Sequence, residues 1–178
     1  MRHILSVLHR MLVYFESERA VAMYTYHSRS RRILDFLSRT RPSAVAQICG
    51  TVEFPEICGT LMLYQSHAGV FVVVSVGGIP ARLGCGKILA MHIHDPATGK
   101  HYNPAGTAHP NHAGDMPPLF VDGSDAWCAF LTERIQVQEV IGKNVVIHRR
   151  RDDFTTQPSG DAGEMIACGE IKRNIGFY

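Results

Sequence analysis

The chain has 178 residues, of which 46% are hydrophobic and 19% are charged. This length is sufficient for one domain with a sizeable core, and the composition is that of an ordinary globular protein. No apolar run approaches the roughly 20 residues that a membrane-spanning helix needs. We therefore do not expect an integral membrane protein.

The beginning of the chain differs from the rest in charge. Residues 1–41 contain eight arginines and three acidic residues, a net charge of +5, whereas the whole chain carries only +2 and the remainder therefore −3. Its apolar residues recur at roughly helical spacing, which predicts a short amphipathic helix: Ile4, Leu5, Leu8, Met11, Leu12 and Phe15. We place a boundary at Pro42, with a basic N-terminal extension at 1–42 and the main domain at 43–178.

Several interpretations of this extension are open. A secretory signal is disfavoured because His9 and Arg10 interrupt the apolar segment. A poorly ordered extension, or translated sequence upstream of the natural start, is favoured. The compartment is unknown, and without a convincing signal the cytoplasm is the favoured expectation. Basic arms bind phosphate backbones, but no recognition motif is present, so we do not expect a nucleic-acid partner.

From residue 44 onward the sequence has the pattern of a β protein. Short segments rich in branched or aromatic residues are bounded by Gly, Pro or Asp, at intervals of roughly 8–12 residues among the early ones. The predicted strands lie within residues 44–54, 58–66, 69–78, 87–94, 126–132 and 143–148. This spacing is typical of an all-β sandwich or barrel. Two long loops, at about 95–125 and 149–164, interrupt the pattern, and such loops are usually functional.

Five of the ten histidines lie within Met91–Asp115, which indicates metal binding. In a strand, alternate residues share a face. His92 and His94 would therefore lie on one face, while Met91 and Ile93 would point to the core. Two imidazoles on one rigid face suit one metal ion, although an H-x-H pair alone is more often a pair of exposed histidines.

The following loop adds three imidazoles and a carboxylate, a complete set for tetrahedral zinc: His101, His109, His112 and Asp115. His148 ends a predicted strand and faces the same side as Asn144 and Val146. Alone it would be an ordinary surface histidine. Together the six histidines and Asp115 supply eight ligand atoms if one imidazole uses both nitrogens, which is four for each of two metals. Imidazole suits copper as well as zinc.

The order of these motifs resembles that of copper/zinc superoxide dismutase. H-x-H, "HYNP", a histidine eight residues later, "HAGD", "GKNVVIH" followed by Asp-Asp, and "GDAGEMIACGEI" occur in that order across residues 44–173. The resemblance implies an eight-stranded Greek-key β-barrel, an immunoglobulin-like sandwich, with long metal-binding and electrostatic loops. It also implies an antioxidant oxidoreductase that converts superoxide anion to oxygen and hydrogen peroxide.

By this resemblance the ligands are divided between two metals. Copper would be bound by His92, His94, His101 and His148, and zinc by His101, His109, His112 and Asp115. His101 would bridge the metals and, with His148, would be catalytic, since the bridge breaks at reduced copper and carries a proton to the departing peroxide. Asp152 would join His92 to His109, as an outer partner of ligating imidazoles normally does.

Three departures from the family pattern affect the expected activity. Met165 stands where the family has an anion-steering arginine, and the arginines at 149–151 are a candidate replacement, or only a solvated basic patch. Cys168 matches the family's second bridging cysteine, but residues 95–100 contain no partner. Cys85 or Cys128 would have to replace it, or Cys168 is a buried thiol. The zinc loop is also short, with His109 and His112 only three residues apart.

Other functions remain in competition with dismutation. A non-catalytic copper- or zinc-binding relative, acting as a metal carrier or a zinc-stabilised domain, is the main alternative. A β-sandwich whose histidines bind nothing is disfavoured by seven ligand-type residues in the family's order. The oligomeric state is open, with a homodimer among the options.

Overall fold

The computed structural model describes residues 35–37, 39–83 and 87–175. The chain divides into two compact units, residues 1–41 and 42–178. The amphipathic helix predicted between Ile4 and Phe15, and Cys85 as a disulfide partner, lie outside the described residues. In the described part of the chain, no helix is both long and apolar enough to cross a membrane.

The second unit is built from antiparallel strands. Within the described residues these are β1 (Ala44–Gly50), β2 (Cys58–Ser66), β3 (Gly69–Gly77), β4 (Ile88–Leu89), β5 (Met91–His94), β6 (Leu119–Asp122), β7 (Asp125–Thr132), β8 (Asn144–His148), β9 (Met165–Glu170) and β10 (Lys172–Arg173). A 3-10 turn, η1 (Ala81–Leu83), and one short helix, α3 (Val137–Val140), complete the elements. Each predicted strand segment overlaps an observed strand.

The strands form a nearly closed barrel with Greek-key order. The hydrogen-bonded path runs β4-β6-β7-β3-β2-β1-β9-β8-β5, and β10 pairs with β1. The two ends of this path, β4 and β5, are separated in sequence by Ala90 alone. A late strand, β9, returns beside β1, which gives the spatial order of a Greek key. The prediction of an eight-stranded barrel is confirmed, because eight of the described strands have four or more residues and β4 and β10 have only two each.

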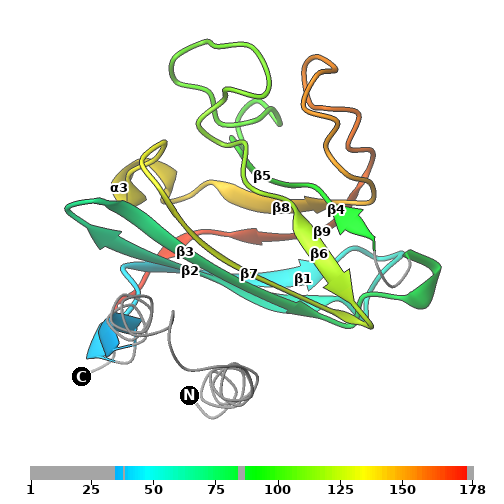
Figure 1. Ribbon diagram of the computed structural model, residues 1–178, viewed down its shortest axis with the longest axis horizontal. Coiled ribbons are helices and arrows are strands. Elements are labelled where there is room, and N and C mark those ends of the chain that lie inside the picture. Colours follow the sequence, from blue (N-terminus) through cyan, green and yellow to red (C-terminus); the bar gives the residue numbers. More distant parts are fainter. Residues whose placement is uncertain (1–34, 38, 84–86, 176–178) are drawn as a thin grey trace, which may run out of the picture. The chain divides into compact units, whose positions relative to one another are not determined.

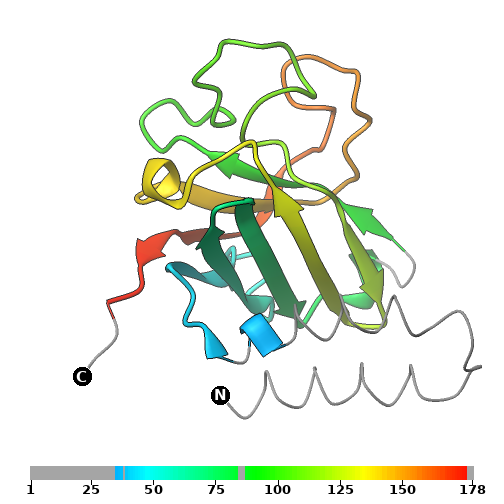
Figure 2. The ribbon, with the colours of Figure 1, turned by 60° about the vertical axis from the view of Figure 1, so that its left-hand side comes forward.

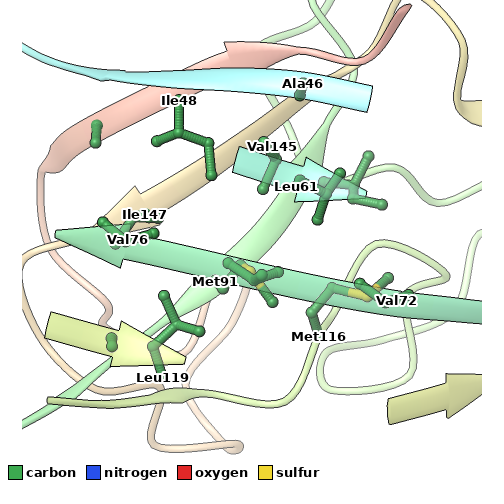
Figure 3. Close-up of a cluster of buried hydrophobic side chains, with 14 of the residues drawn as sticks. Ala46, Ile48, Leu61, Val72, Val76, Met91, Met116, Leu119, Val145 and Ile147 are labelled. Carbon is green, nitrogen blue, oxygen red and sulfur yellow. The ribbon is translucent and has the colours of Figure 1, made fainter. Parts of the chain in front are cut away.

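The interior is filled by alternate residues of these strands (Figure 3). Ala46 and Ile48 of β1 are each 1% exposed, whereas the intervening Gln47 is exposed. Leu61 of β2 and Ile147 of β8 lie in the same core. Side chains alternate between the two faces of a strand, so apolar residues at every second position all lie on the buried face.

Both long loops lie on the same side of the barrel (Figures 1 and 2). The first connects β5 to β6, and the second connects β8 to β9. Because β5 and β8 pair antiparallel, the two loops begin at opposite ends of this strand pair, and they meet where His109 contacts Gln157. The fold therefore brings together two segments that are far apart in the sequence.

Truncation of a core side chain tests this assignment of faces. Leu61 is 2% exposed in the barrel interior, whereas Leu131 of β7 is 52% exposed. We expect Leu61→Ala to lower the free energy of unfolding by about 2–5 kcal/mol, because it leaves a cavity in a packed core. Leu131→Ala, as the matched control, should change it by less than about 1 kcal/mol. Urea denaturation followed by tryptophan fluorescence measures both, and equal losses would contradict the assignment.

Candidate metal centre

Strands β5 and β8 hold the first histidines of the site. They are antiparallel neighbours, with His92 opposite Val146 and His94 opposite Asn144. His148 ends β8 at an irregularity in its pairing with β9, and its backbone N–H donates to the carbonyl of Ala90. As the alternation predicts, Met91 and Ile93 are buried in the core while the two histidines of β5 face the loops.

The structure brings four histidines into one cluster: His92, His94, His101 and His148. One nitrogen from each lies within 4.8 Å of the others. The Nε2 atoms of His94 and His148 are 3.3 Å apart. The other ring nitrogens of these two residues face backbone carbonyls, Gly99 for His94 and Gly163 for His148, which orients both rings.

A second cluster contains the zinc-type ligands from the first loop: His101, His109, His112 and Asp115, all buried. The ring nitrogen Nδ1 of His101 is 2.7 Å from Oδ1 of Asp115 and 3.3 Å from Nδ1 of His112. Nδ1 of His109 is 3.1 Å from Oδ2 of Asp115. The predicted site residues are thus all brought together, in the two sets expected from the sequence.

His101 belongs to both clusters. Its Nδ1 lies in the second cluster, while its Nε2 is buried without a hydrogen-bond partner. Nδ1 of His92 and Nδ1 of His109 are also buried without a hydrogen bond, although the latter lies near Oδ2 of Asp115. Buried polar atoms normally have partners. One of these three nitrogens belongs to the first cluster, one to the second, and one to the shared ring of His101. All three are electron-pair donors that suit cations of the copper or zinc type.

Asp152 joins the two clusters from outside. Its carboxylate lies 2.8 Å from Nε2 of His92 through Oδ2 and 2.8 Å from Nε2 of His109 through Oδ1. Both imidazoles therefore have their far nitrogen fixed, and their Nδ1 atoms are left for a ligand. Gly160 makes this contact feasible, because a Cβ there would lie 1.9 Å from Oδ1 of Asp152.

Burial keeps the imidazoles of His92 and His94 neutral. Burial, together with repulsion from His101, lowers the pKa of His92 to about 3. Burial also lowers the pKa of His94 to about 4. Burial alone would raise the pKa of Asp115, but the hydrogen bond with His101 holds it at about 2. At neutral pH these groups are free of the protons that would compete with a metal ion.

Two side chains that tie the loops together carry no signal in the sequence. The backbone N–H of His109 donates to Oε1 of Gln157, and Nε2 of Gln157 donates to the carbonyl of His109. Arg134 donates to the carbonyls of Pro110 and Asp115. Each contact spans 19–48 residues of sequence. Neither spacing nor periodicity could have found them.

The structure places the residues at which the sequence departs from the family pattern. Met165 begins β9 and is 44% exposed. The arginines at 149–151 line a separate cavity, together with Lys87 and Ile88. Arg149 pairs with Glu164 and Arg150 with Asp161. This placement argues against their acting as a replacement for the missing arginine. Among the described residues that line the roughly 650 Å³ cavity at the histidines, the basic side chain is Lys100.

Comparison with known proteins agrees with this geometry. The family model described as copper/zinc superoxide dismutase matches residues 57–171. The chain is 33% identical over 141 residues to "Superoxide dismutase [Cu-Zn] 2" of Aquifex aeolicus, covering 66% of this chain and 80% of the relative. It is 31% identical over 94 residues to the human "Copper chaperone for superoxide dismutase", covering 45% of this chain and 34% of the chaperone.

Solved structures show the same fold. A double mutant of a SOD-like protein from Bacillus subtilis superposes with a TM-score of 0.59 at 23% identity, covering 71% of this chain and 95% of that protein. At this identity the likeness concerns the fold alone.

The close contact at Gly160 yields a test of the Asp152 bridge. We expect Gly160→Ala to lower zinc affinity about 10–100-fold, as loss of an outer partner of metal ligands does, because the new Cβ displaces the Asp152 carboxylate. Gly123→Ala is the control, since Gly123 has a similar φ of +62° but no neighbour within 4 Å. Competition with a chromogenic chelator measures the affinity. Equal effects of the two variants would mean that backbone strain, not the carboxylate, is responsible.

Proposed function

Because the chain belongs to the copper/zinc superoxide dismutase family, we propose that it converts superoxide to oxygen and hydrogen peroxide at a histidine-bridged copper–zinc centre. The family binds copper and zinc, and the two donor clusters are consistent with both ions. The observation that carries the proposal is the position of His101, which belongs to both clusters and has Nδ1 at Asp115 and a buried Nε2 without a hydrogen-bond partner.

The ligands divide by cluster. His92, His94, His101 and His148 would hold copper in an all-nitrogen set, which Cu(II) accepts. His101, His109, His112 and Asp115 would hold zinc, with three imidazoles and one carboxylate. When bound, copper supplies one-electron oxidation of one superoxide and one-electron reduction of the next, whereas zinc is redox-silent.

Proton delivery is the task of the chain itself. Dismutation consumes two superoxide anions and two protons and releases one oxygen and one hydrogen peroxide. His101 can hold a proton at Nε2, because Nδ1 is engaged on the side of Asp115. Nε2 is directed toward the first cluster, where the peroxide would form. The ring of His92 stacks 3.9 Å from that of His101, which limits reorientation of the proton donor.

A specific observation favours a second candidate, a non-catalytic metal-binding relative. The family's arginine is replaced by Met165, and the neighbouring arginines line a different cavity. One of the relatives is named a copper chaperone rather than an enzyme. Such a protein would bind both ions but dismute superoxide slowly. Retention of all four histidines of the first cluster favours the enzyme.

Superoxide decay separates these two functions. We expect the copper- and zinc-loaded protein to accelerate decay in stopped-flow measurements, and His148→Ala to lower the rate at least about 100-fold, since it removes a copper ligand. His67→Ala is the control, because His67 is an exposed histidine in the β2–β3 turn. Slow decay of the unaltered protein despite full copper occupancy would reject the enzyme in favour of the metal-binding relative.

Lys100 provides a prediction about anion attraction. It lines the cavity at the histidines and makes no ion pair within the described part of the chain. We expect Lys100→Ala to slow superoxide decay severalfold and to weaken its dependence on ionic strength, because a cation near a cleft raises the on-rate of an anion by about 10-fold or more. Arg151→Ala, a change in the separate basic cavity, should alter neither. A similar salt dependence in both variants would contradict this role.

A further inference from the structure

Three cysteines lie side by side on the outer face of the barrel, and none of them belongs to the two histidine clusters. Cys49 of β1 is directly opposite Cys58 of β2 and, on its other side, opposite Cys168 of β9. Directly opposed residues in a sheet share one face. That face is the outer one, since Ile48 points into the core while Cys49 and Cys58 are exposed.

The hydrogen-bond pattern distinguishes the two neighbouring pairs. The N–H of Gly50 donates to the carbonyl of Ile57 at 2.8 Å, which makes Cys49 and Cys58 a non-hydrogen-bonded pair. In such pairs the Cα atoms are about 4.5 Å apart and the side chains are closest. This separation lies within the range of roughly 4.4–6.8 Å that a disulfide bridges.

Cys168 is the less favourable neighbour. The N–H of Thr51 donates to the carbonyl of Ile166 at 2.9 Å, so Cys49 and Cys168 form a hydrogen-bonded pair with Cα atoms about 5.5 Å apart. Cys168 is only partly exposed. Burial raises the pKa of its thiol, and the neighbouring Cys49 raises it further. A smaller fraction of the Cys168 thiol is therefore the reactive thiolate, although Cys168 lies within exchange distance of Cys49.

We propose that Cys49 and Cys58 are a site of oxidative modification, where a hydroperoxide converts the two thiols into a cross-strand disulfide. One thiolate attacks a peroxide oxygen, the O–O bond breaks, and a sulfenic acid and one water result. The second thiol attacks that sulfur, the S–S bond forms, the S–O bond breaks, and a second water leaves. The two thiols lose two electrons and two protons in total, and hydrogen peroxide becomes two waters.

This disulfide differs from the one that the family resemblance implies. The family's bond joins a loop to the position of Cys168, but residues 95–100 contain no cysteine. Cys128 does not replace it, because it lies on β7, which β3, β2 and β1 separate from β9 in the sheet. The bond proposed here would join two strands of the barrel and leave Cys168 as a reserve partner for Cys49.

The test uses the full-length, zinc-loaded protein with added hydrogen peroxide, so its outcome does not depend on dismutation or on copper. The reduced protein is treated with peroxide, alkylated, and digested with trypsin and a Glu-specific protease, which cleaves at Glu53 and Glu56 between the two cysteines. Before alkylation, we expect the intact mass to be about two daltons lower than that of the reduced protein. After digestion, we expect a linked pair of peptides, one with Cys49 and the other with Cys58. The digestion also separates Cys85 from Cys58, since Arg82 lies between them.

Variants decide the assignment. Cys49→Ser should abolish the linked peptides, Cys58→Ser should redirect the bond to Cys168, and Cys128→Ser should leave the Cys49–Cys58 bond unchanged. Cys49→Ala replaces Cys49→Ser if circular dichroism shows that the latter is misfolded. Independent alkylation of Cys49 and Cys58 after peroxide treatment overturns the proposal. So does a link to Cys168 in the unaltered protein, or conversion of the exposed thiols to sulfinic acid without a bond.

Discussion

The burial of many ionisable groups in one small volume is the constraint on which the rest of the structure depends. Five of the six histidines in the two clusters, together with Asp115 and Asp152, are less than 9% exposed. A charged imidazole in such a place is strongly disfavoured, because desolvation penalises the ion and neighbouring imidazoles repel it. The low pKa of His92 expresses both effects. The rings of His92 and His94 are therefore neutral at pH 7, and the buried Nδ1 of His92 is available to a cation.

The barrel and the loops hold the ligand side chains in different ways. Strands β5 and β8 supply His92, His94 and His148 on a rigid, paired surface. The remaining ligands come from irregular backbone, which must be fixed by other contacts. Asp152 fixes His92 and His109 at once, and Gln157 holds the same loop through two backbone contacts of His109. The second loop thus acts as an outer support for ligands of the first.

Sequence alone predicts the parts of the site that follow from local periodicity. The alternation within "MHIH" places His92 and His94 on one face, and ligand type identifies the loop histidines as a set. The role of Asp152 came only from the resemblance, because its partners are 43 and 60 residues away. The need for glycine at position 160 was not predictable, since it depends on a carboxylate brought in by tertiary structure.

The arginines at 149–151 show that neighbours in the sequence need not lie at the same site. Their position directly after His148 suggested a cationic replacement for the residue at Met165. The chain turns away from the strand at that point, and Arg149 and Arg150 form ion pairs with Glu164 and Asp161. Adjacency in sequence did not bring their charge to the histidine cavity. The structure instead has Lys100, from the other loop, at that cavity.

The way in which the first loop is anchored bears on the function of zinc. Residues 95–100 have no cysteine, and the described loop is tied by polar contacts instead. Nζ of Lys143 lies 3.0 Å from Oδ2 of Asp95, and Arg134 donates to backbone carbonyls near the second cluster. Partly exposed contacts of this kind contribute little individually. A cation that joins His101, His109, His112 and Asp115 would therefore supply much of the free energy that orders the loop. This cation would then hold in place His101, the ligand that the loop contributes to the first cluster, whereas β5 and β8 already hold the other three histidines of that cluster.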